Sequence, residues 1–152
     1  MKNILLILII TTLVHLMGCE ERISDTHVNV TPFNFLKGAD ESVIVSFGES
    51  EVRFRAFAIK KKDINEGVKL VSKSKDNTNF SVFAQIGEQV FIRSESFQTS
   101  AQVKVINIDK EHQQAIFEVE ASLINFENAE PFKIDKTTII VEGDNFLLLE
   151  LD

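Results

Sequence analysis

The stretch QAIFEVEASLI, residues 114–124, decides the fold because its side chains alternate between apolar and polar along its length. Every second residue from Ala115 to Leu123 is apolar, whereas Glu118, Glu120 and Ser122 share the opposite face. Successive side chains of a β-strand point to opposite faces of the sheet. The pattern therefore predicts a strand with one buried face and one solvated face.

The same alternation extends over most of the chain on both sides of this stretch. The runs that we expect to form further strands are 42–47, 51–60, 80–86, 89–93, 101–108, 137–141 and 146–151. Glycine and an acidic residue separate neighbouring runs at Gly48-Glu49, Gly87-Glu88 and Gly143-Asp144. Glycine supplies the positive φ of a two-residue hairpin turn, so these pairs indicate antiparallel neighbours. About eight such strands predict an all-β domain, either an antiparallel β-sandwich or a small barrel, and we favour the sandwich.

One segment in the middle of the chain breaks the alternation. Asp63 and Glu66 have the spacing of a helix N-cap and its capping-box partner. From Ile64 onward, apolar residues follow at the i, i+4, i+7 spacing of a helix face. We therefore expect one short helix near residues 63–73, with another strand as the alternative, because Gly67 lowers helix stability.

The composition is that of an ordinary folded domain. The chain has 152 residues, of which 44% are hydrophobic and 26% charged, with a net charge of −7. That length suits one domain. The acidic balance argues against a nucleic-acid partner, whose phosphates bind clusters of Lys and Arg. The chain has 13 Phe but no Trp or Tyr, which argues against a carbohydrate-binding platform.

The first residues carry the signature of a secretory leader. Met1-Lys2-Asn3 is a short, positively charged start, and the residues that follow through Met17 are almost all apolar. This run is shorter than the roughly 20 residues that a membrane-spanning helix needs, but it fits the hydrophobic region of a signal peptide. A buried core helix is the alternative, but it should show polar positions at helical spacing, and residues 4–10 show none.

The run ends in Leu16-Met17-Gly18-Cys19, which contains the only cysteine. These residues resemble the lipobox of bacterial lipoproteins. That motif has an aliphatic residue three positions before the cleavage site, a small residue just before it and an obligatory cysteine just after it. In that family a diacylglycerol is attached to the cysteine sulfur, and a dedicated peptidase then cuts before the cysteine. The resemblance covers residues 1–19 and no family is recognised for the rest. The alternative is a free or buried thiol, since one cysteine forms no internal disulfide.

The resemblance implies that residues 1–18 are removed and that Cys19 becomes the lipidated N-terminus. Each buried CH₂ contributes about 0.8 kcal/mol, so two or three acyl chains make a lasting membrane anchor. The protein would then lie in the cell envelope, outside the cytoplasm. Asp after the cysteine retains lipoproteins at the inner membrane in one group of bacteria, and Glu20 stands here, which favours the outer membrane. We expect residues 19–41 to form a polar tether and residues 42–152 a single β-rich domain.

The chain beyond the leader has no residue pattern typical of an active site. His27 lies in the expected tether and His112 in a charged turn, so neither stands on a helix face that would pair it with a second metal ligand. Neither a phosphate-binding loop nor a nucleophile elbow is present. Glu118 and Glu120 resemble a solvated strand face more than a pair of glycosidase carboxylates. We therefore expect no catalytic residue, no metal and no cofactor.

One strand carries the candidate surface for a partner. Its residues are Arg53, Arg55, Phe57, Ile59, Lys60, Lys61 and Lys62, where the first four share a strand face. The basic side chains suit anionic lipid or an acidic partner, but edge-strand charges also prevent aggregation. Either this strand is covered on both faces, or an apolar patch is exposed for binding.

The sequence thus predicts a membrane-anchored extracytoplasmic lipoprotein whose non-catalytic β-sandwich domain binds an envelope protein or a ligand. Two alternatives stay open. An inhibitor or immunity lipoprotein would block a toxin or an envelope enzyme, and an acidic domain suits a basic partner of that kind. An envelope hydrolase of unrecognised type would need two carboxylates or a histidine brought together in a cleft.

Overall fold

The computed structural model describes residues 27–33, 41–73 and 80–151, which fold into one antiparallel sheet of nine strands. In chain order the strands are β1 (His27–Pro32), β2 (Ser42–Ser50), β3 (Arg53–Lys60), β4 (Lys69–Lys73), β5 (Phe80–Ile86), β6 (Gln89–Ile92), β7 (Ser100–Asp109), β8 (Gln114–Asn125) and β9 (Pro131–Glu142). The prediction of an all-β antiparallel domain is confirmed. None of the helices in the described ranges is long and apolar enough to cross a membrane.

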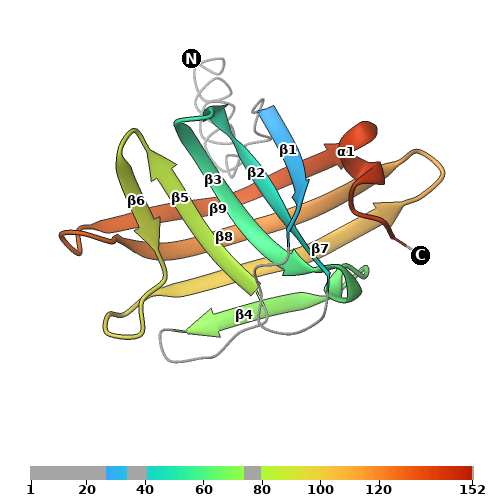
Figure 1. Ribbon diagram of the computed structural model, residues 1–152. Coiled ribbons are helices and arrows are strands. Elements are labelled where there is room, and N and C mark those ends of the chain that lie inside the picture. Colours follow the sequence, from blue (N-terminus) through green and yellow to red (C-terminus); the bar gives the residue numbers. More distant parts are fainter. Residues whose placement is uncertain (1–26, 34–40, 74–79, 152) are drawn as a thin grey trace, which may run out of the picture.

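The sheet folds over into two leaves. The first leaf has the order β1-β2-β3-β5-β6, and the second leaf has the order β4-β7-β8-β9. In the described ranges, β6 and β8 join them through two strand pairs, Phe91 with Asn125 and Ile92 with Ile124. In Figure 1 the strands of the first leaf cross those of the second at a large angle. The sheet stays open, with β1 and β4 at the ends of its path, so the fold is sandwich-like rather than a closed barrel.

The core lies between the two leaves. The apolar face predicted for β8 is buried throughout, at Ala115, Phe117, Val119, Ala121 and Leu123. Phe117 contacts Phe57 of β3, with 5.3 Å between the ring centroids. Phe91 of β6 stacks on Phe132 of β9 at 4.4 Å. Full burial of one such side chain contributes about 1.5–3 kcal/mol to stability, so these pairs hold the leaves together.

The sheet begins earlier than the sequence analysis expects. Residues 27–32, placed there in the tether, form β1, which pairs with β2 over its whole length. Val30 is buried in the core because it alternates with exposed Asn29 and Thr31. The predicted boundary at Ser42 therefore falls inside the sheet.

The helix expected near residues 63–73 does not form. A single 3₁₀ turn, η1, covers Lys61–Asp63, and β4 occupies Lys69–Lys73. Gly67 separates them with a φ of +80°, which ends any helix. Pairing with β7 then places Leu70 and Ser72 toward the core and leaves Val71 exposed, so the strand alternative is the correct one.

The C-terminal run 146–151 is likewise not a strand. A short helix, α1 (Asp144–Leu147), follows Gly143, whose φ is +58°. Phe146 and Leu149 lie three positions apart, so one face of this turn buries both side chains in the core. Helix α1 packs on β1 and β9 at one side of the sandwich (Figure 1).

Candidate functional site

The lipobox residues lie outside the described part of the chain. Leu16, Met17, Gly18 and Cys19 all precede His27, the first described residue. Their assignment to cleavage and lipidation therefore stays a prediction.

The predicted partner surface on β3 does not form one patch. Phe57 and Ile59 are completely buried, and Lys60 is only 5% exposed. The reason is that β3 lies inside its leaf, between β2 and β5, with its inner face under the second leaf. The alternative of a covered strand is therefore correct, and the exposed apolar patch at Phe57 and Ile59 is a wrong prediction.

The charged members of that surface separate toward the two ends of β3. At the start of the strand, exposed Arg53 pairs with Glu49 at 3.5 Å, and Arg55 is half-buried. At its end, Lys61 and Lys62 belong to η1. Of the residues of that surface, Lys61 and Lys62 line the pocket of about 710 Å³ described next.

That pocket has a volume of about 710 Å³, within the range that holds small ligands. Its lining combines apolar Ile64, Ile108 and Leu151, the bases Lys61, Lys62 and Lys110, the acids Glu66, Asp109, Glu111 and Glu150, and the amides Asn65 and Asn107. The three apolar side chains belong to or pack against the core. The pocket lining is therefore mixed, with three apolar side chains among nine charged or amide residues that carry both signs of charge.

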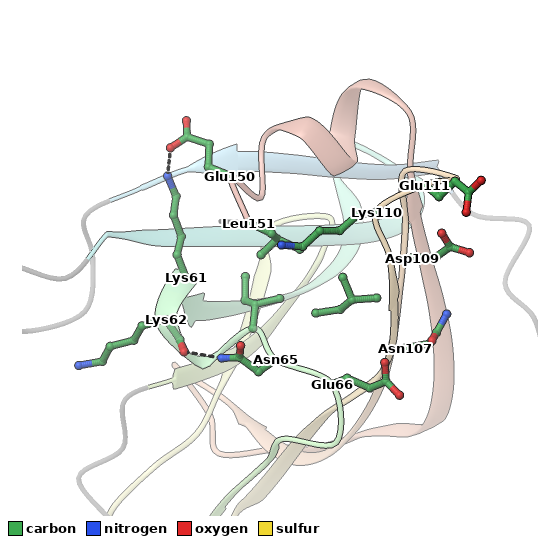
Figure 2. Close-up of a pocket in the computed structure, with 12 residues that line it drawn as sticks. Lys61, Lys62, Asn65, Glu66, Asn107, Asp109, Lys110, Glu111, Glu150 and Leu151 are labelled. Carbon is green, nitrogen blue, oxygen red and sulfur yellow. Dashed lines mark hydrogen bonds and ion pairs between the residues drawn. The ribbon is translucent and has the colours of Figure 1, made fainter.

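Three separate segments build the pocket. Figure 2 shows Lys61 and Lys62 on one side, with Asp109 and Glu111 of the β7–β8 turn on the other. Lys110 extends toward Leu151 of the C-terminal tail. The turn after η1 is fixed to β7 because the N–H of Gly67 donates to the carbonyl of Val105 at 2.9 Å. The strand β7 has an irregularity in its register between Val105 and Asn107, which lies at the pocket.

Lys61 ties the tail to the rest of the site. Its Nζ donates to Oε2 of Glu41 at 2.9 Å and to Oε2 of Glu150. The side chain of Lys61 is 14% exposed, whereas the two glutamates are 70% and 59% exposed. The hydrogen bonds to Glu150 and then to Glu41 raise the pKa of Lys61.

The same ion pair borders a second pocket. Lys61 and Glu150 also line a hollow of about 370 Å³, together with Pro32, Phe33, Glu41 and Ser42. The Lys61–Glu150 pair thus stands between two cavities. Glu150 has a φ of +48°, a strained backbone conformation for a residue other than glycine.

The two histidines of the domain lie apart. His27 begins β1 and is exposed. His112 lies in the β7–β8 turn, where its backbone N–H donates to Oδ1 of Asp109 at 2.9 Å and its Nδ1 lies 2.8 Å from Oδ2. These hydrogen bonds lower the pKa of Asp109. Within the described ranges, no three His, Cys, Asp or Glu side chains are close enough to hold a metal ion.

Glu118 and Glu120 lie on the outer face of the second leaf. Glu118 pairs with Lys136 at 2.8 Å and lies opposite Lys104 on the neighbouring strand. Glu120 is exposed. Their partners and position are those of a charged sheet surface, and neither residue lines the pocket.

Sequence reasoning missed most of the pocket. Glu41 and Glu150 are 109 positions apart by their numbers, and no local pattern links them to Lys61. The local signals are the lysine run 60–62, which belongs to the candidate surface, and the charged turn 109–113, whose residues stand out against the alternation on both sides.

The fold defines the class of protein as an antiparallel two-leaf β-sandwich. No protein-family model matches the chain, and neither a curated protein nor a solved structure matches it.

Proposed function

We propose that this protein is a membrane-anchored extracytoplasmic lipoprotein, and that its sandwich is a non-catalytic module that binds an envelope protein or a ligand. The anchor rests on the sequence Leu16-Met17-Gly18-Cys19 after an apolar leader. The binding role rests on one observation, the pocket of about 710 Å³ whose lining combines apolar side chains with charged and amide side chains of both signs.

The chemistry of the pocket favours binding over catalysis. A general acid or base needs a titratable group free to exchange a proton with a substrate. Here Lys61 is held by Glu41 and Glu150, and Asp109 is held by the turn at His112. A lining that mixes a few apolar side chains with both signs of charge suits a ligand or a chain segment that has polar and apolar parts.

The proposed anchor keeps the domain near the bilayer. Between Cys19 and His27 the extended chain spans at most about 28 Å. The domain therefore acts close to the membrane surface, in the cell envelope, and we favour the outer membrane because Glu20 follows the cysteine.

The test of the binding role is capture of partners from solubilised envelopes in three parallel samples. These are the wild-type acylated protein, a pocket variant, Glu66→Lys, and a control, Glu120→Lys, which makes the same charge change on the second leaf. We expect one stoichiometric partner with the wild type and the control, and its loss with Glu66→Lys. Equal recovery from all three would contradict the pocket as the binding site.

A further inference from the structure

The end of the first leaf at which β1 begins carries exposed apolar side chains. Val52 in the β2–β3 turn is 59% exposed, Val90 at the start of β6 is 40% exposed, and Phe126 after β8 is 72% exposed. Figure 1 shows the start of β1 and the β2–β3 and β5–β6 turns at the same end of this leaf.

Backbone pairing places Val90 beside Phe126, and Val52 lies on the same leaf with β5 between it and β6. The N–H of Gly87 donates to the carbonyl of Val52 at 2.7 Å, and the N–H of Phe126 donates to the carbonyl of Val90 at 2.9 Å. In the register of the leaf, Val90 lies opposite Gln85, and Gln85 lies opposite Phe54. We call the surface formed by Val52, Val90 and Phe126 the turn-end surface.

A half-buried aromatic pair on the outer face of the leaf extends the turn-end surface. Phe54 and Phe83 pack edge to face, with 6.2 Å between their ring centroids. Phe83 lies opposite Ile92, which lies opposite Ile124 of β8. The apolar side chains therefore continue across the junction of the two leaves.

Acidic residues surround this apolar centre. Glu49, Glu51, Glu88 and Glu127 are all exposed in or beside the same turns. Arg53 is the basic residue among them, and it pairs with Glu49. Such a surface repels an anionic bilayer, but it has the apolar centre and charged rim of a protein interface.

The outer face of the second leaf is different. Its charges alternate in sign and are paired, as in Lys136 with Glu118 at 2.8 Å and Lys133 with Asp135 at 2.7 Å. Because these opposite charges pair with one another, that face does not favour a partner that carries charge of one sign. At the turn-end surface, by contrast, acidic side chains outnumber basic ones.

We infer that the turn-end surface docks a protein partner that presents an apolar side chain surrounded by Lys or Arg. The partner's apolar group would cover Phe126 and Val90, while its basic residues face Glu88 and Glu127. The docking surface does not depend on the proposed lipidation. The proposed function enters only where it places the partner beside the membrane.

The test uses full-length protein in detergent and two synthetic peptides, one of alternating Leu and Lys and one of alternating Leu and Glu. We expect the Leu–Lys peptide to bind and to slow amide exchange at residues 49–54, 86–90 and 125–128, and the Leu–Glu peptide not to bind. Phe126→Ser and Glu88→Lys should each weaken binding by about tenfold or more, as for residues at the centre of an interface.

Matched controls separate docking from general attraction to an acidic protein. Val71→Ser removes an apolar side chain that is 51% exposed on the second leaf, and Glu120→Lys makes the same charge change as Glu88→Lys. Both should leave the affinity unchanged. Equal loss with Glu120→Lys would overturn the inference, as would self-association or binding to anionic vesicles that depends on Phe126. A failure of lipid attachment at Cys19 would refute the anchor and leave these results unaltered.

Discussion

Phe57 on β3 and Phe117 on β8 pack with their rings tilted by 52°, although their strands are not hydrogen-bonded neighbours. Both side chains are fully buried. This contact joins the centres of the two leaves, whose strands pair directly at the two residue pairs of β6 with β8 and at the bond from the N–H of Phe126 to the carbonyl of Val90. The sandwich therefore depends on side-chain packing more than on continuous strand pairing.

Truncation of either ring should destabilise the domain strongly. We expect Phe57→Ala or Phe117→Ala to lower the free energy of unfolding by about 3–5 kcal/mol, because each leaves a cavity between the leaves. The double variant should lose less than the sum, with a coupling of about 0.5–1.5 kcal/mol from the ring contact. Urea unfolding of the four proteins measures this, and strict additivity would show that the rings contribute independently.

Asn145 should protect the free edge of β1. Its Oδ1 accepts from the N–H of Val30 at 2.9 Å, and its Nδ2 donates to the carbonyl of Val28 at 3.0 Å. Asn145→Ala removes both hydrogen bonds and should cost about 1–2 kcal/mol. Amide exchange at Val30 should then become faster. Asn29→Ala is the matched control, since the exposed side chain of Asn29 donates to Oγ1 of its neighbour Thr31 at 3.3 Å, and an equal effect there would contradict a special role for Asn145.

Two glycines should respond differently to replacement by alanine. A Cβ on Gly48 would lie 2.5 Å from the carbonyl oxygen of Arg53 and 2.6 Å from Cα of Phe54, so β2 and β3 would have to separate. Gly67 has open space around it but a φ of +80°. We expect Gly67→Ala to lower the free energy of unfolding by about 1–2 kcal/mol and Gly48→Ala to lower it by more. Thermal unfolding of the two variants gives the order of destabilisation. A larger loss with Gly67→Ala than with Gly48→Ala would show that β2 and β3 can relax around the added methyl group.

The Lys61 ion pairs should make stability fall at high pH. Because Glu150 and Glu41 raise the pKa of Lys61 above 10.5, the protonated lysine favours the folded state. This contribution is complete below pH 10.5 and is lost as the pH rises through the raised pKa. Unfolding at several pH values should therefore show the wild type exceeding Lys61→Met by up to about 1 kcal/mol near pH 8, with a smaller difference above pH 11. A difference that does not change with pH would mean that Lys61 acts through packing alone.

How far the sequence predicts this protein depends on the range of the interactions. The face of β8 from Ala115 to Leu123 is predictable because a strand's alternation is local. Residues 63–73 mislead because their apolar spacing also fits a helix, and only pairing of Leu70 with Val103 of β7 selects the strand. The partner of Asn145 and the convergence of Lys61 with Glu150 arise from contacts between distant segments, so no local pattern reveals them.

The anchor at Cys19 is the central claim, and the N-terminus of the protein tests it most directly. Cells that express the full chain are grown with an alkyne-tagged fatty acid, and the purified protein is analysed by mass spectrometry. The account predicts a chain that begins at Cys19 and carries a diacylglyceryl group on its sulfur, while Cys19→Ala gives an unlabelled precursor that still begins at Met1. A wild-type chain that retains Met1 and a free thiol, or label that persists in Cys19→Ala, would contradict it.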